Sequence, residues 1–145
     1  MKPAVTRTLR RTAAALALVA ATAAQAQAFE LTIEVSNAKP GMGTVNAAVY
    51  TDAADWMKDG RTVAASMVQA ADKTVLVFRG LAAGKYGVAL YQDENKNGKL
   101  DTNIVGIPTE RYGFSRDAKG RMGPPSFDDA AVDLQADATI AVQLY

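Results

Sequence analysis

The stretch TVLVFRGLAAGKYGVAL, residues 74–90, holds two strand-like runs on either side of a glycine turn. Residues 74–78 are mostly apolar, as in strands that are covered on both faces. Residues 86–90 alternate between large apolar and small side chains, which is typical of a half-buried strand. The pattern Leu-x-x-Gly-x-Tyr that ends at Tyr86 indicates a tyrosine corner, in which the hydroxyl bonds a backbone group just upstream. An ordinary core tyrosine is the alternative, and a structural role is expected in either case.

Alternation with a period of two recurs on both sides of this stretch. Apolar residues alternate with polar or small ones in five further runs, at residues 31–35, 45–49, 63–67, 130–134 and 140–144. The sequence contains no convincing long helix. It therefore predicts an all-β fold, an immunoglobulin-like or prealbumin-like β-sandwich of about seven strands, with one long ordered loop.

The first residues read as an export signal. A basic segment without acidic residues is followed by an Ala-rich run of 12 residues, 13–24, and small-x-small patterns end at Ala26 and Ala28. This order predicts a secretory signal peptide over residues 1–28, cleaved after Ala28 or alternatively after Ala26. The apolar run is too short to span a bilayer, which takes about 20 residues. We expect a periplasmic or secreted domain, residues 29–145, without a transmembrane anchor.

The amino-acid composition limits which partners, catalytic groups and metal ligands this protein can have. The formal net charge of +1 becomes −3 without the four basic residues of the first segment, because 12 basic residues then face 15 acidic ones. A nucleic-acid partner is not expected, because such proteins carry a basic face. The chain has no His and no Cys, which excludes histidine bases, thiol nucleophiles, disulfides and zinc–thiolate sites. The remaining polar residues favour metals with oxygen ligands, such as calcium, or no chemistry at all.

The most specific motif opens a long segment, residues 93–126, without strand or helix periodicity. In DENKNGKLD, residues 93–101, side-chain oxygens fall at relative positions 1, 3, 5 and 9, with glycine at position 6. This is the spacing of an EF-hand calcium loop, in which position 7 contributes its backbone carbonyl. The predicted ligands are Asp93, Asn95, Asn97, Lys99 and Asp101.

The loop also departs from the EF-hand pattern. Position 12 is Ile104, where an EF-hand has a bidentate glutamate. The missing oxygens are expected from Asn103, Glu110 or another loop. Few anionic ligands predict weak binding, with Kd of about 10⁻⁴–10⁻³ M. The alternative is a polar Asn-Gly turn whose side chains cap their own backbone.

At this point the chain resembles a known family. The run DENKNGKLDTNIVGIPTERYGFS, residues 93–115, resembles the hallmark of a bacterial exported family, domain of unknown function 2141. The earlier Leu-x-x-Gly-x-Tyr and the later PPSFDDA, residues 124–130, resemble that family too, so the resemblance spans essentially the whole mature chain. It implies a small secreted or periplasmic β-sandwich, and it implies no activity.

Three functions are expected from these residues. The first is a calcium-stabilised, non-catalytic module that binds or scaffolds a protein or glycan at the cell envelope. The second is a carbohydrate- or peptide-binding module that uses Trp56, Tyr112 and Phe114 as aromatic platforms. The competing view is that Tyr112 and Phe114 only plug the open end of the sandwich.

The third function is hydrolysis. Asp93, Glu94, Asp101 and Glu110 could pair as carboxylates for glycoside cleavage. A small domain offers little cleft, and these carboxylates sit at ion-ligand spacing. The sequence therefore favours a protein that is not an enzyme.

Overall fold

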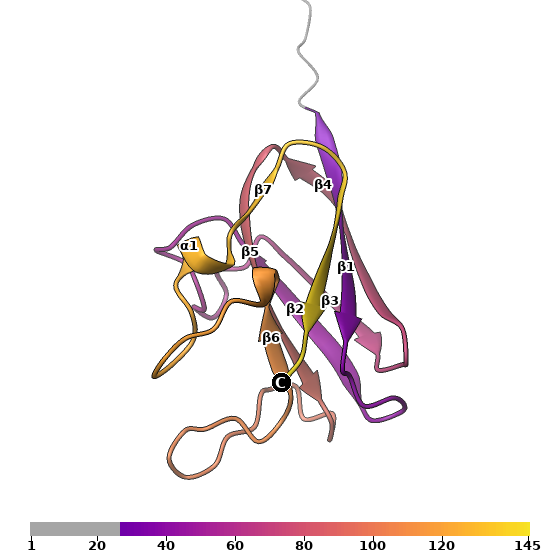
Figure 1. Ribbon diagram of the computed structural model, residues 1–145, viewed down its shortest axis with the longest axis vertical. Helices are drawn as coiled ribbons and strands as arrows, with labels where there is room; N and C mark the ends of the chain where they lie inside the picture. The colour runs from indigo at the N-terminus through magenta and orange to yellow at the C-terminus, as the bar shows by residue number, and fades with distance from the viewer. Residues whose placement is uncertain (1–26) are drawn as a thin grey trace, which may run out of the picture.

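The structure is a computed structural model that describes residues 27–145 (Figure 1). It contains eight strands, a 3-10 helix and one short α-helix. In chain order these are β1 (Ala28–Ser36), β2 (Thr44–Tyr50), β3 (Ala64–Gln69), β4 (Thr74–Ala82), β5 (Gly84–Asp93), β6 (Tyr112–Phe114), η1 (Ser115–Asp117), α1 (Phe127–Ala130), β7 (Val132–Leu134) and β8 (Ala138–Gln143).

The strands form two sheets, which confirms the all-β prediction. One sheet has the order β4-β1-β8, and the other has the order β3-β2-β5-β6, with β7 also paired to β5. The β1–β8 pair is parallel, and the other pairs are antiparallel. Figure 1 shows the yellow strand β8 alongside β1, with which it pairs. The protein is thus a β-sandwich.

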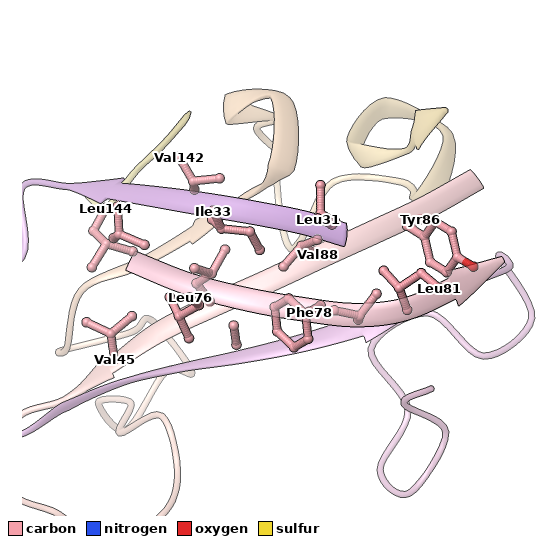
Figure 2. Close-up of a cluster of buried hydrophobic side chains, with 14 of the residues drawn as sticks. Leu31, Ile33, Val45, Leu76, Phe78, Leu81, Tyr86, Val88, Val142 and Leu144 are labelled. Atoms are coloured by element: carbon pink, nitrogen blue, oxygen red, sulfur yellow. The ribbon is translucent and has the colours of Figure 1, made fainter. Parts of the chain in front are cut away.

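The core lies between the two sheets, because each strand turns alternate side chains inward. Figure 2 shows these side chains converging from both sheets. The buried residues include Leu31, Ile33, Val45, Val49, Leu76, Phe78, Tyr86, Val88, Leu90, Val142 and Leu144. The tyrosine corner is confirmed, since the Tyr86 hydroxyl donates to the Ala82 carbonyl oxygen at 2.8 Å.

Two expectations about strands were wrong. Residues 74–78 are not covered on both faces, because β4 is an edge strand with only one face against the other sheet, and Val75 is 43% exposed. The segment 93–126 is not one continuous loop, because it contains β6 and η1. A strand of three residues is too short to show a periodicity in the sequence.

The predicted signal peptide lies outside the described residues, except for its last two positions. Within residues 27–145, no helix is both long enough and apolar enough to cross a membrane.

Candidate functional site

The candidate calcium loop begins where β5 ends. Asp93 is the last residue of that strand and is only 2% exposed. Its carboxylate accepts backbone N–H bonds from Asn97 at 3.0 Å and from Gly98 at 2.7 Å. Gly98 has a φ of +82°, a conformation that L side chains adopt only with strain. Asp93 and Gly98 therefore produce the tight curl that the sequence predicts.

The other polar side chains of the loop converge on Asp101. Asn95 donates its amide N–H to one carboxylate oxygen of Asp101 at 2.6 Å, and Asn97 donates to both oxygens at 2.8 and 2.9 Å. These bonds, from Asn97 first and then Asn95, lower the pKa of Asp101, and the charge of Lys99 adds to the effect.

Glu110 closes the base of the loop. Its side chain is 8% exposed and accepts the N–H of Glu94 at 2.8 Å and the N–H of Asp101 at 2.9 Å. Both carboxylate oxygens are thus held by backbone groups at the two ends of the loop.

Burial raises the pKa of Tyr91, and the negative charges of Asp93 and Glu110 raise it further.

The remaining two candidate ligands are placed differently. The Asn103 side-chain oxygen accepts the N–H groups of Val105 and Ile107, both at 3.0 Å, so this side chain shapes the next turn instead of joining the group at Asp101. The backbone N–H of Lys99 donates to the Asn97 side-chain oxygen at 3.1 Å.

The loop offers hard oxygen donors but few charges. Within residues 27–145, no three Asp, Glu, His or Cys side chains come together as a metal-binding group. The side chains that meet are the Asp101 carboxylate and the amides of Asn95 and Asn97, whereas the Asp93 carboxylate accepts the backbone N–H groups of Asn97 and Gly98. Both amides donate N–H groups to Asp101 in this arrangement. Rotation of an amide by half a turn exchanges its N–H₂ for its oxygen, so calcium coordination by this loop requires both amides to turn.

The three aromatic residues predicted as a ligand surface all pack against other aromatic rings. Trp56 lies 5.2 Å from Tyr50, 6.0 Å from Phe114 and 5.8 Å from Phe127, measured between ring centroids. Its indole N–H donates to the Pro125 carbonyl oxygen at 2.8 Å. Tyr112 and Phe114 lie on β6, an edge strand, with ring centroids 6.0 Å apart.

An apolar groove runs along the outer face of the five-stranded sheet. Its volume is about 720 Å³, which falls within the range of small-molecule pockets. Tyr112 and Phe114 line it, but Trp56 is not among its lining residues. One wall comes from Lys99 and Leu100, so the groove borders the candidate calcium loop directly.

The sequence analysis did not identify this groove. Its floor consists of the outward-facing residues of three strands, and they include Ala48, Ala65 and Ala89. The available signal was a single alanine among mostly larger outward-facing residues in each strand. That signal has meaning only when the pairing register, which brings the three alanines together, is known.

The fold and the site define an all-β sandwich with a polar loop bordering an outer-sheet groove. The profile of the family described as "Uncharacterized protein conserved in bacteria (DUF2141)" matches residues 33–142. The chain belongs to this family, which confirms the resemblance seen in the sequence. No curated protein and no solved structure matches the chain.

Proposed function

We propose that this protein is an exported, non-catalytic binding module of the bacterial cell envelope whose 93–101 loop is stabilised by calcium. The observation that carries the proposal is the convergence of Asn95 and Asn97 on Asp101, within 2.6–2.9 Å. Oxygen ligands of one calcium ion lie close together, because calcium–oxygen distances are about 2.3–2.6 Å, and these three side chains are near enough to share an ion once both amides turn their oxygens toward it.

The position of the loop supports a role for the ion in binding. Asp93 joins the loop to β5, and Lys99 and Leu100 form a wall of the groove. A cation held between Asp93 and Asp101 would offset the charge of both carboxylates and restrain this wall. Export is supported by the basic and Ala-rich N-terminal sequence.

The geometry of the carboxylates supports a role other than catalysis. Asp93 and Glu110 are almost fully buried, and each accepts two backbone N–H bonds. A general acid or base needs a carboxyl group within reach of the substrate. These two carboxyl groups are occupied in holding the loop.

Calorimetric titration with calcium tests the proposal, together with melting curves of the purified protein in calcium and in EDTA. We expect saturable binding at a Kd of about 10⁻⁴–10⁻³ M and a higher melting temperature in calcium. Asp101→Asn should abolish both effects, because it removes a charged ligand while keeping the size of the side chain. Asp72→Asn, at an exposed position outside the loop, is the matched control.

Two outcomes would contradict the proposal. One is no heat of binding up to several millimolar calcium, the weak limit for such loops. The other is equal melting temperatures in calcium and EDTA. Export is tested separately by sequencing the N-terminus of the protein recovered from the periplasm or medium, where an intact residue 1 would oppose it.

Binding of a carbohydrate or peptide through Trp56, Tyr112 and Phe114 receives less support. Trp56 is engaged by three aromatic neighbours and by a backbone carbonyl. Tyr112 and Phe114 do line the groove, so the geometry supports the groove, and not an exposed aromatic row, as the ligand-binding surface.

A further inference from the structure

Three alanines form a continuous strip on the floor of the groove. Ala48 on β2 pairs with Ala65 on β3 and with Ala89 on β5. The neighbours of Ala48 in the chain, Ala47 and Val49, point into the core, so the three methyl groups face outward. Adjacent strands lie about 4.8 Å apart, so the strip is about 10 Å long and runs across the strands.

Large side chains rise on both sides of this alanine strip. One side of the strip is a row of larger residues that lies two positions nearer the calcium loop on each strand. Neighbouring strands pair along this row, which consists of Met67, Asn46, Tyr91 and Tyr112. Two residues in the other direction, Tyr50 pairs with Gly87, and Trp56 occupies the space above that glycine, where an added Cβ would lie 2.7 Å from the indole ring. The alanine strip is therefore the floor of a narrow slot.

The slot has one closed end and one open end. Phe114 pairs with Ala89 and is buried, so its ring closes the end at β6. At the other end lies β3, the edge strand of the sheet, where Ala65 is exposed and Met67 is 66% exposed. This edge is therefore the side from which a ligand would enter.

The charges at the rim favour an anionic group near the calcium loop. Lys99 lines the groove, and the ion pairs of residues 27–145 involve other basic residues. The Asp93 carboxylate nearby is engaged by two backbone N–H groups. Asp59 also lines the groove and is preceded and followed by basic residues in the chain, Lys58 and Arg61, of which Arg61 pairs with Asp55.

We propose that this slot binds an unbranched apolar chain with a carboxylate head group, a ligand of the fatty-acid class. The chain lies over the alanine strip, and the carboxylate lies against Lys99. A sugar would lose hydrogen bonds to water over a floor of methyl groups, which offers none in return. A peptide laid across the strands would leave backbone N–H and C=O groups unpaired for the same reason. The inference rests on the proposed role as a binding module, but it does not depend on calcium.

The test is a titration with decanoate in EDTA, followed by the emission of Trp56. This residue is the only tryptophan of the chain, and it contacts Tyr50 and Phe114 at the slot. Decan-1-ol and decylammonium supply the same chain with a neutral and a cationic head. We expect decanoate to bind tightest, by about fivefold over the alcohol, which corresponds to a partly exposed ion pair.

Two pairs of variants separate the slot from the head-group site. Ala48→Leu fills the slot and should weaken decanoate binding by about tenfold or more, whereas Ala141→Leu, on an exposed position of β8 in the other sheet, should not. Lys99→Gln should remove the preference for decanoate over decan-1-ol. Lys96→Gln, in the same loop but outside the groove lining, should keep it.

The results that overturn the inference are distinct from failure of the proposed calcium role. It is overturned if decanoate does not bind, if decan-1-ol or decylammonium binds equally well or better, or if Ala48→Leu folds and binds as the parent does. If Ala48→Leu does not fold, the comparison of decanoate with decan-1-ol and decylammonium, and the effect of Lys99→Gln on that comparison, still test the inference. Decanoate binding without calcium binding would remove the calcium proposal and leave the slot assignment in place.

Discussion

The buried carboxylate of Glu110 accepts a hydrogen bond from the backbone N–H of Asp101, 2.9 Å away, across nine residues of chain. Its second oxygen holds the N–H of Glu94 at 2.8 Å. One side chain thus fastens both ends of the candidate calcium loop. This relationship explains why the loop keeps its shape without flanking helices of the EF-hand type.

Removal of this clasp should destabilise the protein. Glu110→Ala leaves two backbone N–H groups without acceptors, and we expect a loss of about 2–6 kcal/mol in the free energy of unfolding, since each unsatisfied group costs about 1–3 kcal/mol. Glu110→Gln retains one acceptor oxygen and should lose less. Urea unfolding curves measure both, with Glu34→Gln on the exposed face of β1 as a control. A loss in Glu110→Ala no larger than in the control would show that the clasp does not contribute.

Tyr86 gives a second prediction, on the tyrosine corner. Tyr86→Phe removes the 2.8 Å hydrogen bond to the Ala82 carbonyl oxygen and leaves the buried ring in place. We expect a loss of about 1 kcal/mol, the usual contribution of one hydrogen bond. Tyr145→Phe, whose hydroxyl makes only a 3.5 Å exposed contact, should change stability less. Thermal unfolding compares the two, and equal stability of both variants would contradict the assignment.

Two glycines of one turn should respond differently to alanine. Gly43 has a φ of +65°, and a Cβ there would lie 1.8 Å from the backbone oxygen of Asp93. Gly43→Ala must displace the end of β5, and we expect a loss of about 4 kcal/mol from strain and overpacking together. Gly41 has a φ of +73° with no atom within 4 Å of the added Cβ.

Gly41→Ala is therefore the control for conformational strain alone, which costs about 1–2 kcal/mol. In denaturant unfolding, the free energy of unfolding should be highest for the parent, somewhat lower for Gly41→Ala and much lower for Gly43→Ala. Equal losses of stability at the two positions would contradict this prediction, because they would mean that β5 moves away from the new Cβ at little energetic cost.

The acid stability of the protein should depend on Asp101. Bonds from Asn97 and Asn95 lower the pKa of Asp101 below its ordinary value of 3.8 in the folded state. A lowered folded pKa means that the stabilisation is complete above the ordinary pKa and is lost as the pH falls through the folded value. Melting temperatures of the parent in metal-free buffer should thus fall more between pH 6 and about pH 3 than those of Asp101→Asn. Parallel curves for the two proteins would contradict the pKa shift.

Much of the fold could be predicted from residue patterns alone. The alternations at residues 31–35 and 86–90 mark strands because one face of each strand must be buried. β6 could not be predicted, because its three residues, Tyr112–Phe114, are held by pairing with β5 and not by any local pattern. The exposure of Val75 was also missed, because the place of a strand within a sheet depends on distant segments.

The candidate site also has features that the local sequence determines and features that only the tertiary structure determines. The nine residues from Asp93 to Asp101 contain their own ligand spacing and their own glycine, so the sequence by itself determined the curl of the loop. Only the tertiary structure decided that Glu110 closes the loop and that Asn103 does not join it. The alanine slot was likewise decided by tertiary structure, since Ala48, Ala65 and Ala89 meet only through the register of β2 with β3 and β5. Local chemistry acts over a few residues, whereas pairing register acts between segments far apart in the chain.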